Sequence, residues 1–155
     1  TSSVFMVVTE VKASGANWAV ATLEANWSAR RWHTSLVYDN KMWVMGGQDG
    51  AGLKNDVWSS TDGITWTEVT AAAAWPARLG FTSLVYNNKM WVMGGDVAPG
   101  LKNDVWSSTD GVIWTEVTAA AAWPARSYIT SAVYDNKMWV MGGVGKNDVW
   151  HSVLP

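Results

Sequence analysis

The 155-residue sequence contains no cysteine, which excludes disulfide bonds, thiol catalysis and cysteine-ligated zinc sites. Only 15% of its residues are charged, and the formal net charge of −2 is not built from blocks of one sign. This balance gives no electrostatic reason to expect nucleic acid or an anionic membrane as a partner. No uncharged apolar stretch approaches the ~20 residues that cross a bilayer, so we expect no membrane-spanning segment.

Phenylalanine is also scarce, with 2 residues against 13 tryptophans and 14 glycines. Apolar residues make up 48% of the chain, a proportion typical of globular proteins. The length suits one domain of ordinary size. The unusual composition therefore bears on architecture rather than on the choice of ligand.

Self-comparison of the sequence reveals a repeat with a period of 48 residues. Residues 53–78 return as residues 101–126 with only two substitutions, and residues 33–47 return twice more at the same step. The last copy is then shortened by four residues. Periods of this length are typical of propellers and other repeat architectures.

The tryptophans define where the units begin and end. Twelve of the 13 fall into four columns at the repeat spacing, and only Trp32 stands outside them. Trp18 and Trp27 lie 48 residues before Trp66 and Trp75, so residues near them match the final quarter of a unit. The predicted organisation is an extension at 1–15 with a strand-like segment at 4–11, followed at 16–155 by an outer strand and connection (16–30) and three units (31–78, 79–126 and 127–155, the last without its outer strand).

Within one unit, nearly every segment has strand character. Alternating, β-branched and aromatic residues predict four strands, at 34–38, 41–45, 56–59 and 65–70. The first two form a hairpin around Asp39-Asn40, and we expect Gly46-Gly47 to end the second strand. The four alanines at 71–74 are too few to nucleate a helix, so they are interpreted as a connection.

These features resemble the kelch repeat. The resemblance rests on Gly46-Gly47, on Asp56-Val57-Trp58, on Trp66, and on Arg30 with His33. It covers roughly residues 16–151 and implies an all-β propeller of four-stranded blades, three per chain, whose first strands line a central channel. One departure is that Phe81 and Ile129 stand at the His33 position in the other units.

The turn at 59–66, SSTDGITW, resembles the Asp box of sialidase-type propellers but is one residue short of that spacing. In that family the motif is structural. We therefore interpret Asp62 and Asp110 as turn residues.

Three blades do not close a ring, because propellers have roughly 4–8 of them. Open blade faces rich in tryptophan, valine and methionine form apolar patches that soluble monomers rarely expose. We therefore expect a homodimer, a six-bladed ring in which residues 16–22 complete the third blade of the partner chain. Alternatively, the chain is a fragment of a longer propeller. The near-identity of the units also fits an engineered or recently amplified repeat.

Differences among the units are concentrated at one end of the expected blades. Loops on a rigid repeat scaffold often carry binding residues, although drift at unconstrained positions gives the same pattern. The candidate binding residues at this end for a protein or small-molecule ligand are Arg31, Trp32, His33, Gln48, Asp49, Leu79, Phe81, Asp96, Val97, Ser127, Tyr128 and Val144.

Six charged residues recur once per unit, and we assign them to bridges between blades rather than to an anion site. They are Arg30, Arg78, Arg126, Asp56, Asp104 and Asp148. His33 has no accompanying serine and aspartate, so no catalytic residue is assigned, and no metal or cofactor is expected. The leading hypothesis is a non-enzymatic binding or assembly module; the alternative is a carbohydrate-binding or glycan-processing propeller using Trp32, Tyr128 and Asp49.

Overall fold

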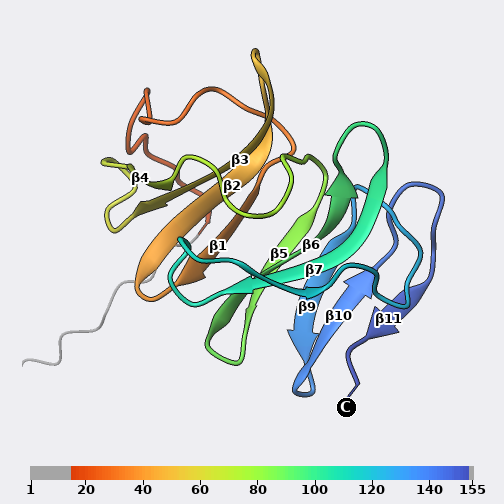
Figure 1. Cartoon of the computed structure of the whole chain (residues 1–155). Helices are drawn as coiled ribbons and strands as arrows, with labels where there is room; N and C mark the ends of the chain where they lie inside the picture. Colours follow the sequence, from red (N-terminus) through yellow and green to blue (C-terminus); the bar gives the residue numbers. More distant parts are fainter. Residues whose placement is uncertain (1–14, 154–155) are drawn as a thin grey trace, which may run out of the picture.

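The computed structural model describes residues 15–153, which form antiparallel β-sheets and contain no helix (Figure 1). The all-β prediction is confirmed, whereas the strand expected at 4–11 lies outside the described residues. The first sheet has the order β1-β2-β3-β4, the second β5-β6-β7-β8 and the third β11-β10-β9. The strands are β1 (Thr34–Tyr38), β2 (Lys41–Asp49), β3 (Gly52–Ser60), β4 (Thr67–Thr70), β5 (Thr82–Tyr86), β6 (Lys89–Asp96), β7 (Leu101–Ser108), β8 (Thr115–Thr118), β9 (Thr130–Tyr134), β10 (Lys137–Met141) and β11 (Val149–His151).

The hairpin predicted between the first two strands of each unit is present. Tyr38 pairs with Lys41, which leaves Asp39 and Asn40 as the two turn residues, with φ values of 48° and 58°. Two-residue hairpin turns need positive φ at both positions, and aspartate and asparagine tolerate it best among residues with side chains. The same turn recurs in the second and third sheets.

The glycine pair does not end the second strand, so that expectation was wrong. β2 continues through Gly46-Gly47 to Asp49, with a shift of register between Met45 and Gly47. A Cβ atom on Gly47 would lie 2.7 Å from the carbonyl oxygen of Arg31, so only glycine permits this close approach of the connection. The pair is a bulge that bends a continuous strand.

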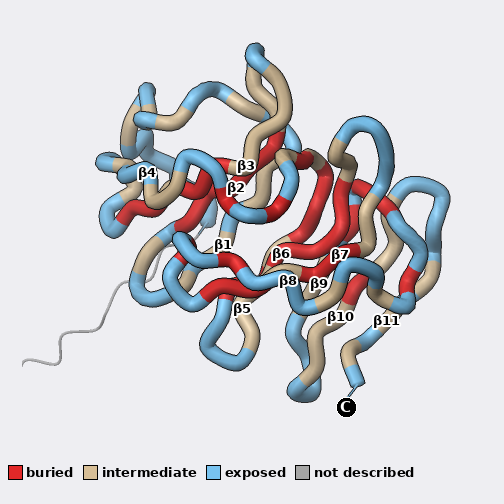
Figure 2. The backbone as a smooth tube through the Cα atoms, viewed as in Figure 1, coloured by how far each residue is buried: buried red, intermediate tan, exposed pale blue. Residues whose placement is uncertain are grey.

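Two apolar seams hold the three sheets together, and Figure 2 shows buried backbone concentrated along them. We call the interface between the first and second sheets the first seam and that between the second and third sheets the second seam. The buried residues of the first seam are Trp43, Met45, Val57, Ala73, Trp75, Phe81, Met90, Val92 and Trp114. Those of the second seam are Leu84, Met93, Val105, Trp123, Ile129 and Val140.

The first strands of the three sheets, β1, β5 and β9, are neighbours, as the resemblance implies for channel-lining strands. Hydroxyl pairs join them in the same way at both steps. The Thr34 and Ser83 hydroxyls are 2.6 Å apart, and so are those of Thr82 and Ser131. These pairs fix the spacing between successive sheets at their inner edge.

Residues 15–30 form no strand in this single chain. The outer strand expected at 16–22 is therefore not formed here, and within residues 15–153 the third sheet contains three strands. Trp18, within that segment, is 90% exposed.

Candidate functional site

The fold brings the variable positions of each unit together. Arg31 bridges to Gln48 and Leu79 to Asp96, so each incoming connection lies against the loop between the second and third strands. In the third sheet the Val144 backbone N–H donates to the Ser127 carbonyl at 3.1 Å. In each unit, therefore, the variable connection and the variable loop lie next to each other.

An aromatic pair lies on this face. The rings of Trp32 and Tyr128 meet edge to face with centroids 6.0 Å apart, although the two residues are 96 positions apart. The Arg31 guanidinium lies 4.1 Å from the centre of the Trp32 ring, a cation–π contact. Trp32 is 40% exposed and Tyr128 46%, so both rings remain accessible to a ligand.

The backbone beneath the pair is strained. Trp32 and Tyr128 have φ values of 58° and 55°, and Gly80, at the equivalent position of the second unit, has 60°. The Gly80 N–H donates to the Trp32 carbonyl at 3.1 Å, and the Tyr128 N–H donates to the Gly80 carbonyl. Left-handed backbone costs a residue with a Cβ about 1–2 kcal/mol, so this ladder holds two large aromatics in a conformation that they disfavour.

Asp49 is held in a network at the same face. Its carboxylate accepts from Ser28 Oγ at 2.7 Å and pairs with Lys54 Nζ at 3.0 Å. The Ser28 hydrogen bond, followed by that of Lys54, holds the pKa of Asp49 well below its usual range. The Asp49 carboxylate is therefore ionised near neutral pH.

Two predicted binding residues are not available on this face. Phe81 is 5% exposed and packs in the first seam against Trp75, and Ser127 is 3% exposed. A ligand cannot reach either side chain, so both are removed from the candidate surface. Leu79, Asp96 and Val97 are partly buried, and Val144 is 63% exposed.

The six recurring charges form three Arg–Asp pairs that repeat the same geometry. Arg78 contacts both Asp104 oxygens, at 2.8 and 2.7 Å, and donates to the Gly94 carbonyl at 2.8 Å. Arg30 pairs with Asp56 and Arg126 with Asp148 in the same bidentate way. Each arginine comes from the connection before a sheet and each aspartate from that sheet, so the pairs fasten the connections to the scaffold.

The aspartate of each pair also accepts from a tryptophan. In the second sheet, Trp106 Nε1 donates to Asp104 at 2.9 Å. Burial alone raises the pKa of Asp104, but the hydrogen bond and charge of Arg78, with that of Trp106, outweigh it and lower the pKa below its ordinary value. The carboxylate and the guanidinium are thus paired with each other, and neither is free to hold a metal or an anion.

His33 lies partly buried beside Trp27, with ring centroids 6.0 Å apart. Burial, and then the charge of Arg30, lower the pKa of His33, so the imidazole is neutral near pH 7. His151 stacks on Trp139 at the end of β11, in another part of the chain. Among residues 15–153, no cluster of histidine and acidic side chains could hold a metal ion.

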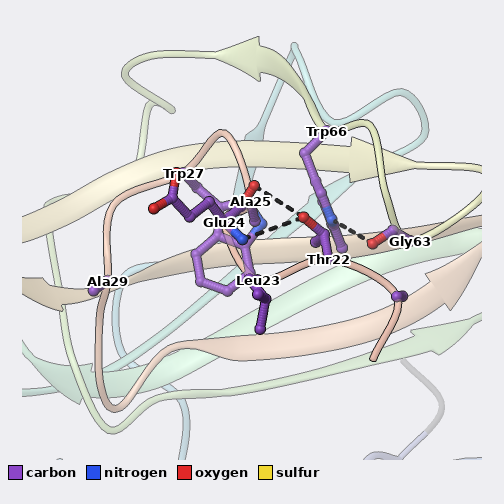
Figure 3. A pocket seen from close by; sticks show the side chains of 9 residues that line it. Thr22, Leu23, Glu24, Ala25, Trp27, Ala29, Gly63 and Trp66 are labelled. Carbon is purple, nitrogen blue, oxygen red and sulfur yellow. Dashed lines mark hydrogen bonds between the residues drawn. The ribbon is translucent and has the colours of Figure 1, made fainter. Parts of the chain in front are cut away.

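Sequence reasoning did not identify two of the cavities that lie outside the loop face. One, of about 570 Å³, lies beside β4 and is lined by residues 21–25 together with Trp27, Ala29, Gly63 and Trp66 (Figure 3). In Figure 3, Thr22 bonds to the backbone of Glu24, and Trp66 Nε1 donates to the Gly63 carbonyl at 3.3 Å. The other, a groove of about 400 Å³, follows the second seam.

The aspartate in the turn at 59–66 forms hydrogen bonds within the turn itself. Asp62 Oδ1 accepts from the backbone N–H groups of Ile64 and Thr65, both at 2.8 Å, and from Ser60 Oγ at 3.0 Å. Asp110 repeats these bonds in the second sheet. The aspartate stabilises the turn from within, which leaves it no separate chemical role.

Comparison with known protein families identifies a repeat domain over most of the chain. A family model described as the KLHDC2/KLHL20/DRC7 Kelch-repeats domain matches residues 33–154. The comparison with curated proteins gives no match. No helix in the described part of the chain is long and apolar enough to cross a membrane.

Proposed function

Because the chain belongs to the kelch-repeat family, we propose that it is a non-enzymatic binding module whose variable loop face takes a protein ligand. Kelch-repeat domains are in general protein-interaction propellers. The observation that carries the proposal is the exposed Trp32–Tyr128 pair with Arg31 stacked on it. Tryptophan, tyrosine and arginine are the residues that most often dominate protein interfaces.

The strained backbone under the pair supports the same proposal. Trp32 and Tyr128 keep left-handed conformations that glycine takes at the equivalent position without strain. Strain of this kind is concentrated at binding sites, where the surroundings impose it. The rings are therefore preorganised, which lowers the entropy lost when a ligand binds.

Carbohydrate binding is the second candidate, and one observation favours it. Two accessible rings meet at an edge-to-face angle of 82°, and Arg31 and Gln48 lie beside them as polar groups. Aromatic faces with nearby hydrogen-bonding groups suit a sugar as well as a peptide. A small-molecule ligand of this class would occupy the same face.

A paired selection tests the proposal. A random peptide display library is selected on the wild-type protein, with Trp32→Ala and Ile113→Ala as separate comparison targets. We expect peptides that bind wild type and Ile113→Ala but lose at least ~10-fold in affinity for Trp32→Ala, because removing a central aromatic costs about 1.4 kcal/mol or more. Ile113 is the control because it is 70% exposed on a turn between the third and fourth strands.

A glycan array probed with the same three proteins separates the two candidates. Binding that Trp32→Ala abolishes on the glycan array, without any selected peptide, would favour the carbohydrate function. If no peptide and no glycan shows binding that depends on Trp32, both candidate functions are contradicted.

We further propose that a second copy completes the propeller, giving a six-bladed ring from two chains. The apolar groove at the second seam and the exposure of Trp18 support this. The near-identical units also support an engineered or recently amplified origin.

A further inference from the structure

Trp27, in the segment before the first sheet, occupies the position that Trp75 occupies one repeat later. The Trp27 and Trp66 rings are 5.9 Å apart at 90°, and the Trp75 and Trp114 rings, 48 residues later, are 5.9 Å apart at 88°. Two pairs with the same distance and angle are equivalent in three dimensions. The repeat assignment of residues near Trp27 therefore holds for the folded chain as well as for the sequence.

Trp18 does not occupy its repeat position. It belongs to the column of Trp66 and Trp114, yet its side chain is 90% exposed, whereas Trp114 is 5% exposed. Its Nε1 donates to the nearby Gly15 carbonyl, at 3.0 Å. An indole is the largest apolar side chain, and burying it is strongly favourable. Among the described residues, Trp18 thus lacks the environment that Trp66 and Trp114 have.

The groove at the second seam is lined by the repeat equivalents of residues in the first seam, where Trp114 is buried. The groove of about 400 Å³ is lined there by Trp91, Met93, Val105 and Trp123, which lie 48 residues after Trp43, Met45, Val57 and Trp75 of the first seam. No described residue takes the place that Trp114 takes in the first seam. Among residues 15–153, no aromatic ring contacts Trp123, whereas Trp75 contacts two.

The strand edge beside the groove predicts a register. In the first sheet β3 pairs with β4, with Trp58 opposite Glu68 and Ser59 opposite Thr67. In the third sheet β11 pairs only with β10 among the described strands, so its outer edge is free for a further strand. Carried over by repeat position, the register places Val20 opposite Trp150 and Ala19 opposite His151.

The chain's own segment lies at the wrong place to fill this groove. Residues 21–25 line the cavity with Gly63 and Trp66 beside the first sheet (Figure 3), at the opposite end of the row of sheets from β11 (Figure 1). A second copy offers the same segment without this constraint. Residues 16–22 and the groove lining contain no Asp, Glu, Lys or Arg, so docking them desolvates no full charge.

We propose that residues 16–22 of a second copy add a strand to β11 and place Trp18 in the second-seam groove. The two copies exchange these segments reciprocally, so each groove is completed by the other chain. The inference rests on the proposed dimeric ring and names the residues that close it.

Cross-linking tests the register directly. The protein has no native cysteine, and residues opposite each other on antiparallel strands have Cα atoms ~4.5–5.5 Å apart, within the range that a disulfide spans. We expect an Ala19→Cys variant mixed with a His151→Cys variant to give a covalent dimer on a non-reducing gel. The matched control, Ile113→Cys mixed with His151→Cys, is expected to give none.

A second measurement tests the role of the indole. We expect Trp18→Ala to raise the dimer dissociation constant at least ~30-fold, the effect of losing an interface hot spot. Ile113→Ala is the control and is expected to leave the constant unchanged. Sedimentation velocity over a concentration series gives the constants, and circular dichroism confirms that both variants are folded.

Three outcomes would overturn the inference: a wild-type monomer at all concentrations, an intrachain disulfide in the Ala19→Cys/His151→Cys double variant, or a dimer that the 19–151 pair does not cross-link. The last would leave the dimeric ring standing with a different closure. Conversely, a correct cross-link without any peptide or glycan binding would count against the proposed binding function alone.

Discussion

The two seams are made from nearly the same sequence, yet they differ in how completely they are closed. In the first seam Trp75 is 0% exposed and contacts Phe81 and Trp114. In the second seam Trp123, from an equivalent stretch, borders an open groove. The contrast extends to the ion pairs, since the Asp104 side chain is 5% exposed and that of Asp148 36%. Burial here depends on which neighbour follows a unit rather than on the unit's own residues.

Truncating the central tryptophan of each seam is expected to give the largest effect. Trp75→Ala removes a fully buried indole and should lower the free energy of unfolding by about 3–5 kcal/mol. Trp123→Ala should cost less in the monomer, because Trp123 is 7% exposed and borders the groove, whereas Trp75 is 0% exposed. Urea unfolding at low protein concentration measures both, and equal losses would contradict the contrast.

Breaking the Arg–Asp pairs should give the next largest effect. Arg78→Met leaves the buried Asp104 carboxylate without its partner and should cost about 3 kcal/mol, the low end for a broken buried pair. Arg126→Met should cost less, because water reaches Asp148 and replaces part of the interaction. The measurement is again urea unfolding, and a larger loss for Arg126→Met would count against the contrast.

Gly63 and Gly111 occupy equivalent positions in the first two units, and substituting them gives a third comparison of how closely a unit is packed by its neighbour. A Cβ on Gly111 would overlap the Trp43 ring in the first seam, whereas on Gly63 it would meet only Met42 Cε, at 3.2 Å. Both glycines have positive φ, so alanine is strained at each by about 1 kcal/mol. Gly111→Ala should therefore cost about 2 kcal/mol in thermal unfolding and Gly63→Ala about 1.

Substituting Gly63 also tests the proposed six-bladed ring. Trp139 is the counterpart of Trp43 in the third unit, so in the proposed dimer it would face Gly63 of the other copy. Gly63→Ala should then weaken dimerisation as well as cost the monomer about 1 kcal/mol. An unchanged dimer dissociation constant would argue against this packing.

The smallest expected effect is the pH dependence at His33. The folded state lowers the pKa of His33 below its ordinary value, so the unfolded chain binds more protons as the pH falls through about 6.5. Stability from this residue is fully present above that pH and declines below it. His33→Phe, which copies the second unit, should show a shallower decline between pH 7 and 5 in thermal unfolding. A decline of the same slope in both proteins would remove the assignment to His33.

The sequence predicted most of the fold because the residues that form hairpins and turns, and the tryptophans, recur in each unit at the repeat spacing. The Asp39-Asn40 turn was read correctly, since only a few residue types accept positive φ at both positions. Gly46-Gly47 was misread because paired glycines mark either a strand end or a bulge. The close approach of Arg31 that decides for a bulge is a tertiary contact.

The candidate site was predicted less well, for a related reason. Variation among the units predicts exposed positions, but Phe81 and Ile129 are both buried in the seams. The apolar character of two of the three residues in that column was the available signal. Gly80 was a second signal, because a glycine in the column of Trp32 and Tyr128 marks a backbone position with positive φ. The contact between the Trp32 and Tyr128 rings could not be predicted from the sequence, because it depends on how the units are arranged in space.

The hydroxyl pairs along the inner strands carry a consequence for assembly. A molecule with a donor segment at one end and a receptive edge at the other makes head-to-tail contacts, which produce closed rings or open fibres according to the rotation per step. The Thr34–Ser83 and Thr82–Ser131 contacts join successive sheets within one chain, so we expect the angle that they hold to contribute to that rotation. Lengthening one of them by a single methylene is thus a means of steering the protein from a finite particle toward a filament.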